Sequence, residues 1–162
     1  TASHGAVKAV SAVPPPVAVP TGRKIKARLF YVTDDGMHLT AVEREIAYGE
    51  GAAEQAREII EAQFAPVAEP LVSAIPVGTK LKALFVTEGG TAFVDLSPEV
   101  VSANAGGTVN ELLTAYTIVN ALTSNLPAIS SVQLLVDGKE VDTLAGHVDL
   151  RRPLAKNPAW VQ

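Results

Sequence analysis

The sequence is poor in several residue types, and each shortage excludes a class of protein. The 162-residue chain has no cysteine, which excludes a disulfide framework, a thiolate metal site and a thiol nucleophile. Aromatic residues make up 5% and charged residues 19%, and the net charge is −4, whereas a nucleic-acid-binding domain is usually basic. No apolar run approaches the roughly 20 residues that a membrane-spanning helix needs. Hydrophobic residues nevertheless reach 48%, so we expect one domain with a real core.

The first 22 residues differ in composition from the rest of the chain. They are almost entirely Ala, Val, Ser, Pro and Gly, and Lys8 carries their only fixed side-chain charge. Four prolines between Pro14 and Pro20 favour an extended backbone. We predict a disordered linker or tail over residues 1–22, in preference to a proline-rich ligand for a recognition domain, and a single domain over residues 23–162.

Hydrophobic periodicity predicts the secondary structure of that domain. Six segments predict strands, because apolar and polar residues alternate in them or because a short apolar run lies between turn residues. One-sided apolar stripes predict two helices. The strands cover residues 24–31, 39–47, 79–87, 91–96, 132–136 and 139–142, and the helices cover 52–64 and 108–126. Hairpin-connected strands with two such helices predict an α+β fold, in which a mixed or antiparallel sheet carries both helices on one face.

The second helix has the clearest start signal. Gly106 and Gly107 precede Thr108, and Glu111 follows three residues later. This spacing predicts a capping box, in which the Thr108 hydroxyl and the Glu111 carboxylate each accept a free backbone amide. An anion site at the helix N-terminus is the functional alternative. No glycine-rich nucleotide motif is present, so we interpret Gly106 and Gly107 as structural.

His147 is the histidine whose surroundings offer chemistry. Asp142 and Asp149 flank it, so the three residues could form an acid/base pair or supply metal ligands. In the structural alternative, the Asp and His side chains bond unpaired amides in a loop that leaves a hairpin. We predict the structural role, and therefore no catalytic residue, no cofactor and no metal site.

Basic residues recur on two predicted strands. Lys24, Lys26 and Arg28 share one face of the first strand, and Lys80 and Lys82 share one face of another. If the two strands are neighbours, the five cations form a stripe on the face of the sheet away from the helices. Such a stripe could meet an acidic partner or an anionic wall polymer. The alternative is the ordinary solvated side of a sheet.

Five collinear segments carry a resemblance to a known family. Their sequences are SAIPVGTKL at 73–81, FVDLS at 93–97, GGT with Glu111 at 106–111, IVNALT at 118–123 and LVDGKEVDTLAGHVD at 135–149. Together they resemble the GerMN domain, the sporulation and spore-germination domain of bacterial lipoproteins and membrane-anchored proteins. The resemblance runs from about Lys24 to Leu154, and its last segment is the most specific.

The resemblance implies an extracytoplasmic bacterial module that is anchored by a lipid or by one membrane helix. It also implies a fold similar to the ring-building domains of secretion-type assemblies, a role in the cell envelope, and no established enzymatic activity. For the Gly-His-Val-Asp segment it implies a fold-determining role, in which Gly146 takes a positive φ and His147 and Asp149 bond the backbone. The chain departs from the family in having one copy and no lipobox cysteine, and it begins with Thr1, so we expect an anchor upstream.

The sequence is compatible with three candidate functions. The first is a non-catalytic assembly module that binds a protein partner in the bacterial envelope, with self-association left open and no nucleic-acid ligand. The second is a binding module for wall glycan or another anionic ligand. Phenylalanines aside, it has only Trp160, Tyr31, Tyr48 and Tyr116 to offer as aromatics. The third is a hydrolase centred on His147. We predict the first.

Overall fold

The computed structural model describes residues 22–162, and the linker predicted for residues 1–22 lies outside that part except for Gly22. The described chain begins with a hairpin, in which β1 (Lys24–Val32) pairs antiparallel with β2 (Leu39–Ala47). Helix α1 (Gly51–Phe64) follows the hairpin. All three elements were predicted by hydrophobic periodicity, to within a residue at either end.

The second half builds a mixed sheet. β3 (Leu81–Val86) pairs antiparallel with β4 (Thr91–Leu96), and β4 pairs parallel with β5 (Ser131–Val136). A parallel neighbour requires a long crossover, which is supplied by helix α3 (Thr108–Asn125). The remaining elements are short: α2 (Glu99–Ser102), β6 (Lys139–Glu140), β7 (Leu154–Ala155) and the 3₁₀ helix η1 (Pro158–Trp160). The predicted α+β class is confirmed.

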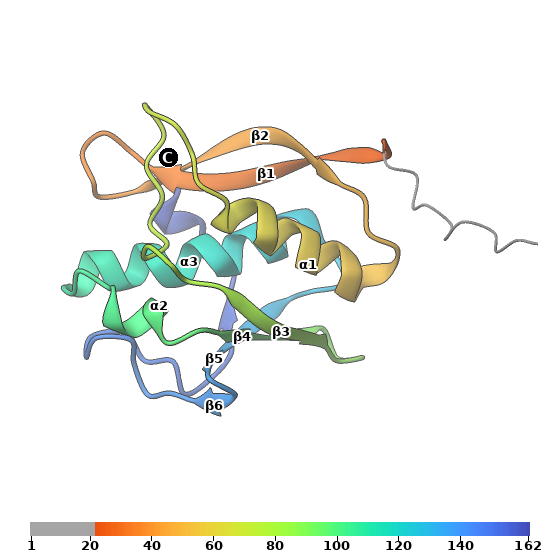
Figure 1. Ribbon diagram of the computed structural model, residues 1–162. Helices are drawn as coiled ribbons and strands as arrows, with labels where there is room; N and C mark the ends of the chain where they lie inside the picture. Colours follow the sequence, from red (N-terminus) through yellow and green to blue (C-terminus); the bar gives the residue numbers. More distant parts are fainter. Residues whose placement is uncertain (1–21) are drawn as a thin grey trace, which may run out of the picture.

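The helices lie between two sheets. Figure 1 shows α1 and α3 above the β3–β4–β5 sheet, with the β1–β2 hairpin on their other side. The two helices therefore share one face of the mixed sheet, as predicted, but the first two strands form a separate sheet. The cause is that α3 is buried nearly all round its middle, where Ile118, Val119 and Leu122 are each inaccessible to solvent. A helix that is apolar on several sides needs cover on several sides.

Side-chain amides attach the hairpin to the helices. Gln63 of α1 accepts the N–H of Phe30 and donates to its carbonyl, both at 2.8 Å. Asn125 of α3 forms the same pair of bonds with the backbone of Arg28, both at 2.9 Å. Each amide thus replaces the backbone of a neighbouring strand, and together they cover the free edge of β1.

The C-terminal segment returns from the mixed sheet to the hairpin. Asn157 N–H donates to the side chain of Asn120 in α3 at 3.1 Å, and Val161 then forms a parallel bridge with Leu39 at the start of β2. The sequence predicted no element after residue 142, because contacts of single residues leave no periodic pattern. None of the helices within residues 22–162 is both long enough and apolar enough to cross a membrane.

Candidate functional site

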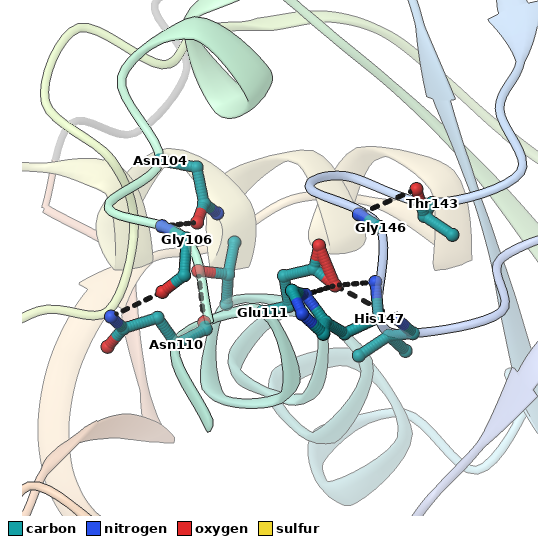
Figure 2. A network of polar contacts seen from close by, with 9 residues as sticks. Asn104, Gly106, Asn110, Glu111, Thr143, Gly146 and His147 are labelled. Atoms are coloured by element: carbon teal, nitrogen blue, oxygen red, sulfur yellow. Dashed lines mark hydrogen bonds and ion pairs between the residues drawn. The ribbon is translucent and has the colours of Figure 1, made fainter. Parts of the chain in front are cut away.

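Glu111 holds the loop that contains His147 against helix α3. Its side chain is fully buried, and Oε2 accepts the backbone N–H of His147 at 2.7 Å and of Val148 at 2.9 Å. Figure 2 shows the carboxylate reaching from α3 toward this loop. A buried carboxylate must be paired or hydrogen-bonded, and here the backbone of a distant loop bonds Oε2, whereas the buried Oε1 has no partner among the described residues. We call this pair of bonds the Glu111 clamp.

The predicted capping box is wrong. The N-cap of α3 is Gly107 with φ 88°, no side chain bonds at the cap, and Thr108 is already the first helical residue. A φ of this sign suits glycine and disfavours the residues that usually cap helices. Asn104 Oδ1 accepts the N–H of Gly106 at 2.8 Å, and Asn110 Nδ2 donates to the carbonyl of Gly106 at 2.8 Å (Figure 2). Glu111 cannot reach back to the cap because it faces the His147 loop.

The loop around His147 is held in place by hydrogen bonds that its backbone N–H groups donate. Gly146 has φ 102°, the positive value expected for it, and its N–H donates to Thr143 Oγ1 at 2.9 Å. His147 enters the Glu111 clamp through its amide, while its imidazole is about half exposed, with Nδ1 3.7 Å from Glu111 Oε2. The expectation that the His147 side chain itself bonds the backbone is therefore wrong for the described residues.

The two aspartates that flank His147 have other partners. Asp149 accepts two bonds from the Arg151 guanidinium, at 2.9 and 3.0 Å, and one from the Arg151 N–H at 3.0 Å. These bonds lower the pKa of Asp149 to about 2. Asp142 accepts the N–H of Leu150 on its backbone oxygen at 2.7 Å. The ion-pair partner of His147 is Glu111 and neither aspartate, and within residues 22–162 no three metal-ligating side chains converge.

A groove of about 330 Å³ lies beside the start of α3. It is lined by residues 72–77, by residues 103–105 and by the α3 side chains Asn110, Leu113 and Thr114. Two lining residues are strongly exposed, Val72 at 55% and Val77 at 88%. Met37, next to the lining residue Gly36, is 48% exposed. We call this the α3 groove. Its exposed apolar side chains are grouped around one groove, whereas exposed apolar residues are ordinarily scattered singly over a surface.

The predicted basic stripe does not form. β1 and β3 belong to different sheets, which lie on opposite sides of the helices (Figure 1). Lys24, Lys26 and Arg28 of β1 therefore lie apart from Lys82 of β3 and from Lys80, which directly precedes that strand. The β1 cations also face acids, because Glu45 is the register partner of Lys26 and Glu43 that of Arg28.

The acids bind two of the five cations directly. Lys26 Nζ lies 3.7 Å from Glu43 Oε1, and Lys82 Nζ donates to Asp137 Oδ1 at 2.7 Å, which raises the pKa of Lys82. Both strand faces therefore carry mixed charge, not a stripe of one sign.

Two features of the site were not predicted from the sequence, the α3 groove and the Glu111 clamp. The α3 groove depends on the fold of residues 67–78, which the sequence showed only as a loop with prolines. The Glu111 clamp had a signal, because Glu111 occupies the same helical stripe as Ala115, Ile118 and Leu122, all buried. An acid in an otherwise apolar stripe indicates a buried polar contact.

Comparisons with known proteins place the chain among sporulation domains. The Germane family, described as "Sporulation and spore germination", matches residues 28–142. A crystal structure of a candidate lipoprotein from Clostridium perfringens is 25% identical, with a TM-score of 0.58 over 88% of this chain and 95% of that one. No match is found among curated proteins.

Two further structures come from the sporulation protein GerM of Bacillus subtilis. Its tandem GerMN domains are 16% identical, with a TM-score of 0.63 over 82% of this chain and 46% of that one, so this chain spans about half of the tandem. Its first GerMN domain alone is 16% identical, with a TM-score of 0.54 over 82% of this chain and 96% of that one. The GerMN resemblance indicated by the sequence is confirmed.

Proposed function

The chain belongs to the Germane family of sporulation and spore germination, and from this premise we propose that it is a non-catalytic assembly module outside the bacterial cytoplasmic membrane. The likeness to a candidate lipoprotein supports the extracytoplasmic, membrane-anchored location. The partner is a protein of the cell envelope. The likeness to ring-building domains, which implies self-association, stays a prediction.

The α3 groove is the observation that carries this proposal. Val77 keeps 88% of its surface exposed beside a concave apolar site, which costs solubility unless a partner covers it. Apolar anchors that fill pockets supply most of the binding energy at protein interfaces. Two bonds hold its lining in place: the N–H of Val32 donates to the carbonyl of Val72 at 2.7 Å, and Thr114 Oγ1 donates to the carbonyl of Ala74 at 2.8 Å. The groove is therefore formed before any partner arrives.

A non-catalytic role is supported by the engagement of Glu111. Its Oε2 atom, which lies 3.7 Å from the His147 imidazole, already accepts two backbone amides and so has a structural task. The observations for the glycan-binding alternative are weaker in the structure than in the sequence. The basic stripe does not form, and Tyr31, one of the few available aromatics, is fully buried.

The proposal is tested by affinity capture and cross-linking from envelope extracts of the organism that encodes the chain. The wild-type domain should retain a defined set of envelope proteins. The Val77→Asp variant should bind these proteins at least about tenfold more weakly, which corresponds to about 1.4 kcal/mol of binding free energy. Phe85→Ser is the matched control, because Phe85 is a 62% exposed apolar residue on β3, outside the α3 groove.

Capture that is equal for all three proteins would contradict a role for the α3 groove, and no capture by the wild type would contradict the assembly function. Turnover of peptidoglycan fragments by the wild type, lost in a folded His147→Ala variant, would contradict the non-catalytic role.

A further inference from the structure

The two edges of the β1–β2 sheet differ in how many of their backbone groups are hydrogen-bonded by the rest of the molecule. In an antiparallel pair, the backbone groups of alternate residues point away from the partner strand. On β1 the outward groups of Arg28 and Phe30 are bonded by Asn125 and Gln63, and the N–H of Val32 donates to the carbonyl of Val72 at 2.7 Å. That edge is closed from Arg28 to Val32.

The opposite edge, on β2, is open in its middle. The register partners of Arg28 and Phe30 are Glu43 and Ala41, so their backbone groups also point outward, and Glu45 follows two residues on. Among residues 22–162, no other element bonds these three backbones. The open stretch of five residues is as long as an ordinary strand.

Both ends of this stretch are already paired by the chain itself. At one end the N–H of Gln162 donates to the carbonyl of Leu39 at 2.8 Å, beside the parallel bridge between Leu39 and Val161. At the other end Gln55 Nε2 donates to the carbonyl of Ala47 at 3.1 Å. The edge is therefore bonded at Leu39 by the backbone and at Ala47 by a side chain, and it is open between them at Ala41, Glu43 and Glu45.

The side chains around the open stretch define what fits there. Glu43 and Glu45 lie on one face of the sheet, where Glu43 is 64% exposed and Glu45 forms no ion pair with any residue of 22–162. On the other face, β2 borders a cavity of about 190 Å³. It is lined by the apolar residues Leu29, Ile46, Ala62, Ala65 and Val67 and by the charged residues Arg44 and Glu45. An added strand would alternate between these two faces.

We propose that the β2 edge from Ala41 to Glu45 binds an extended segment of a partner protein in which basic and apolar residues alternate. The backbone of the segment pairs with the three open residues, its cations face Glu43 and Glu45, and its apolar side chains face the cavity. A second copy of β2 fits less well, because pairing centred on Glu43 places like charges opposite each other. This inference rests on the proposed assembly function.

The test uses the purified full chain and the acetylated, amidated peptide (Lys-Val)₄, followed by amide hydrogen exchange in NMR. At saturation, the N–H groups of Ala41, Glu43 and Glu45 should exchange at least about tenfold more slowly, because strand pairing protects them. The charge-reversed peptide (Glu-Val)₄ should bind at least about tenfold more weakly.

Two variants separate backbone pairing from charge. Glu43→Pro removes an outward N–H while sparing the ladder with β1, and it should weaken peptide binding by at least about tenfold. Glu43→Gln is its matched control and should retain protection at all three amides. If Glu43→Pro does not fold, the double variant Glu43→Lys with Glu45→Lys replaces it and should reverse the preference between the two peptides.

Three outcomes overturn the proposal: no protection at these amides, equal binding of both peptides, or a dimer formed through this edge as seen by size-exclusion chromatography. These outcomes leave the assembly function standing if envelope proteins are still captured in a manner that depends on Val77. Conversely, peptide binding at β2 without any captured envelope protein would count against the assembly function alone.

Discussion

The carboxylate of Glu111 accepts the backbone N–H of Val148 at 2.9 Å, although 37 residues separate the two in sequence. This bond and its companion to His147 fasten the loop around His147 to the central helix. The loop therefore stabilises the fold through its backbone, and the imidazole of His147 is about half exposed at the surface.

Removal of the Glu111 clamp should destabilise the domain. Glu111→Ala leaves two amides of the His147 loop without an acceptor, and we expect a loss of about 2–4 kcal/mol in the free energy of unfolding. Glu111→Gln keeps one acceptor oxygen and should lose less. Thr108→Ala is the matched control, because Thr108 makes no capping bond, and should change stability by less than about 0.5 kcal/mol. Chemical denaturation measures all three, and a larger effect at Thr108 than at Glu111 would restore the capping box.

The His147 loop should depend more on Gly146 than on the histidine side chain. His147→Ala keeps the amide that bonds Glu111, so we expect a loss below about 1 kcal/mol. Gly146→Ala has free space for its Cβ but must adopt φ 102°, and we expect a loss of about 1–3 kcal/mol. Thermal melts of the two variants compare them directly. A His147→Ala variant that is the less stable of the two would assign a structural role to the imidazole.

Leu122 should be one of the most costly residues to truncate. It is fully buried in α3, between the two sheets, so Leu122→Ala removes apolar contacts on both sides and leaves a cavity. We expect a loss of about 2–5 kcal/mol by urea denaturation. Val101→Ala, at a 38% exposed position of α2, is the control and should cost much less. A loss at Leu122 below about 0.5 kcal/mol would contradict its place in the core.

The pairing of Asp149 with Arg151 should be visible in a pH titration. The guanidinium and the Arg151 amide hold the pKa of Asp149 at about 2 in the folded state, below its ordinary value of 3.8. Because the folded pKa is lowered, the pair stabilises the loop above the ordinary pKa, and this contribution disappears as the pH falls toward 2. NMR titration of the Asp149 carboxyl carbon should give a midpoint near 2. In Arg151→Ala the midpoint should rise toward the ordinary value, and an unchanged midpoint would show that Arg151 is not the cause.

Local pattern was sufficient to predict most of the secondary structure. Hydrophobic periodicity predicted both strands of the first hairpin. The strands predicted at 132–136 and 139–142 also left Asp137 and Gly138, which both have positive φ, as the turn between β5 and β6. These features depend on residues within a few positions of one another. For the same reason the short β7 and η1 were missed, since each depends on contacts with elements far away in sequence.

Tertiary structure alone decided which elements became neighbours, and with that the character of the site. The sequence by itself determined that Lys26 and Lys82 lie on amphipathic strands, but the burial of α3 on several sides placed those strands in separate sheets. It likewise determined that Glu111 lies near a helix start, whereas the desolvation of its carboxylate against the His147 loop decided its bonding. Hydrogen bonds that span 33 to 97 residues, such as those of Gln63 and Asn125, arise only when packing brings the partners together. The physical reason is that local periodicity reports which face of an element is apolar, while the identity of what covers that face depends on the whole chain.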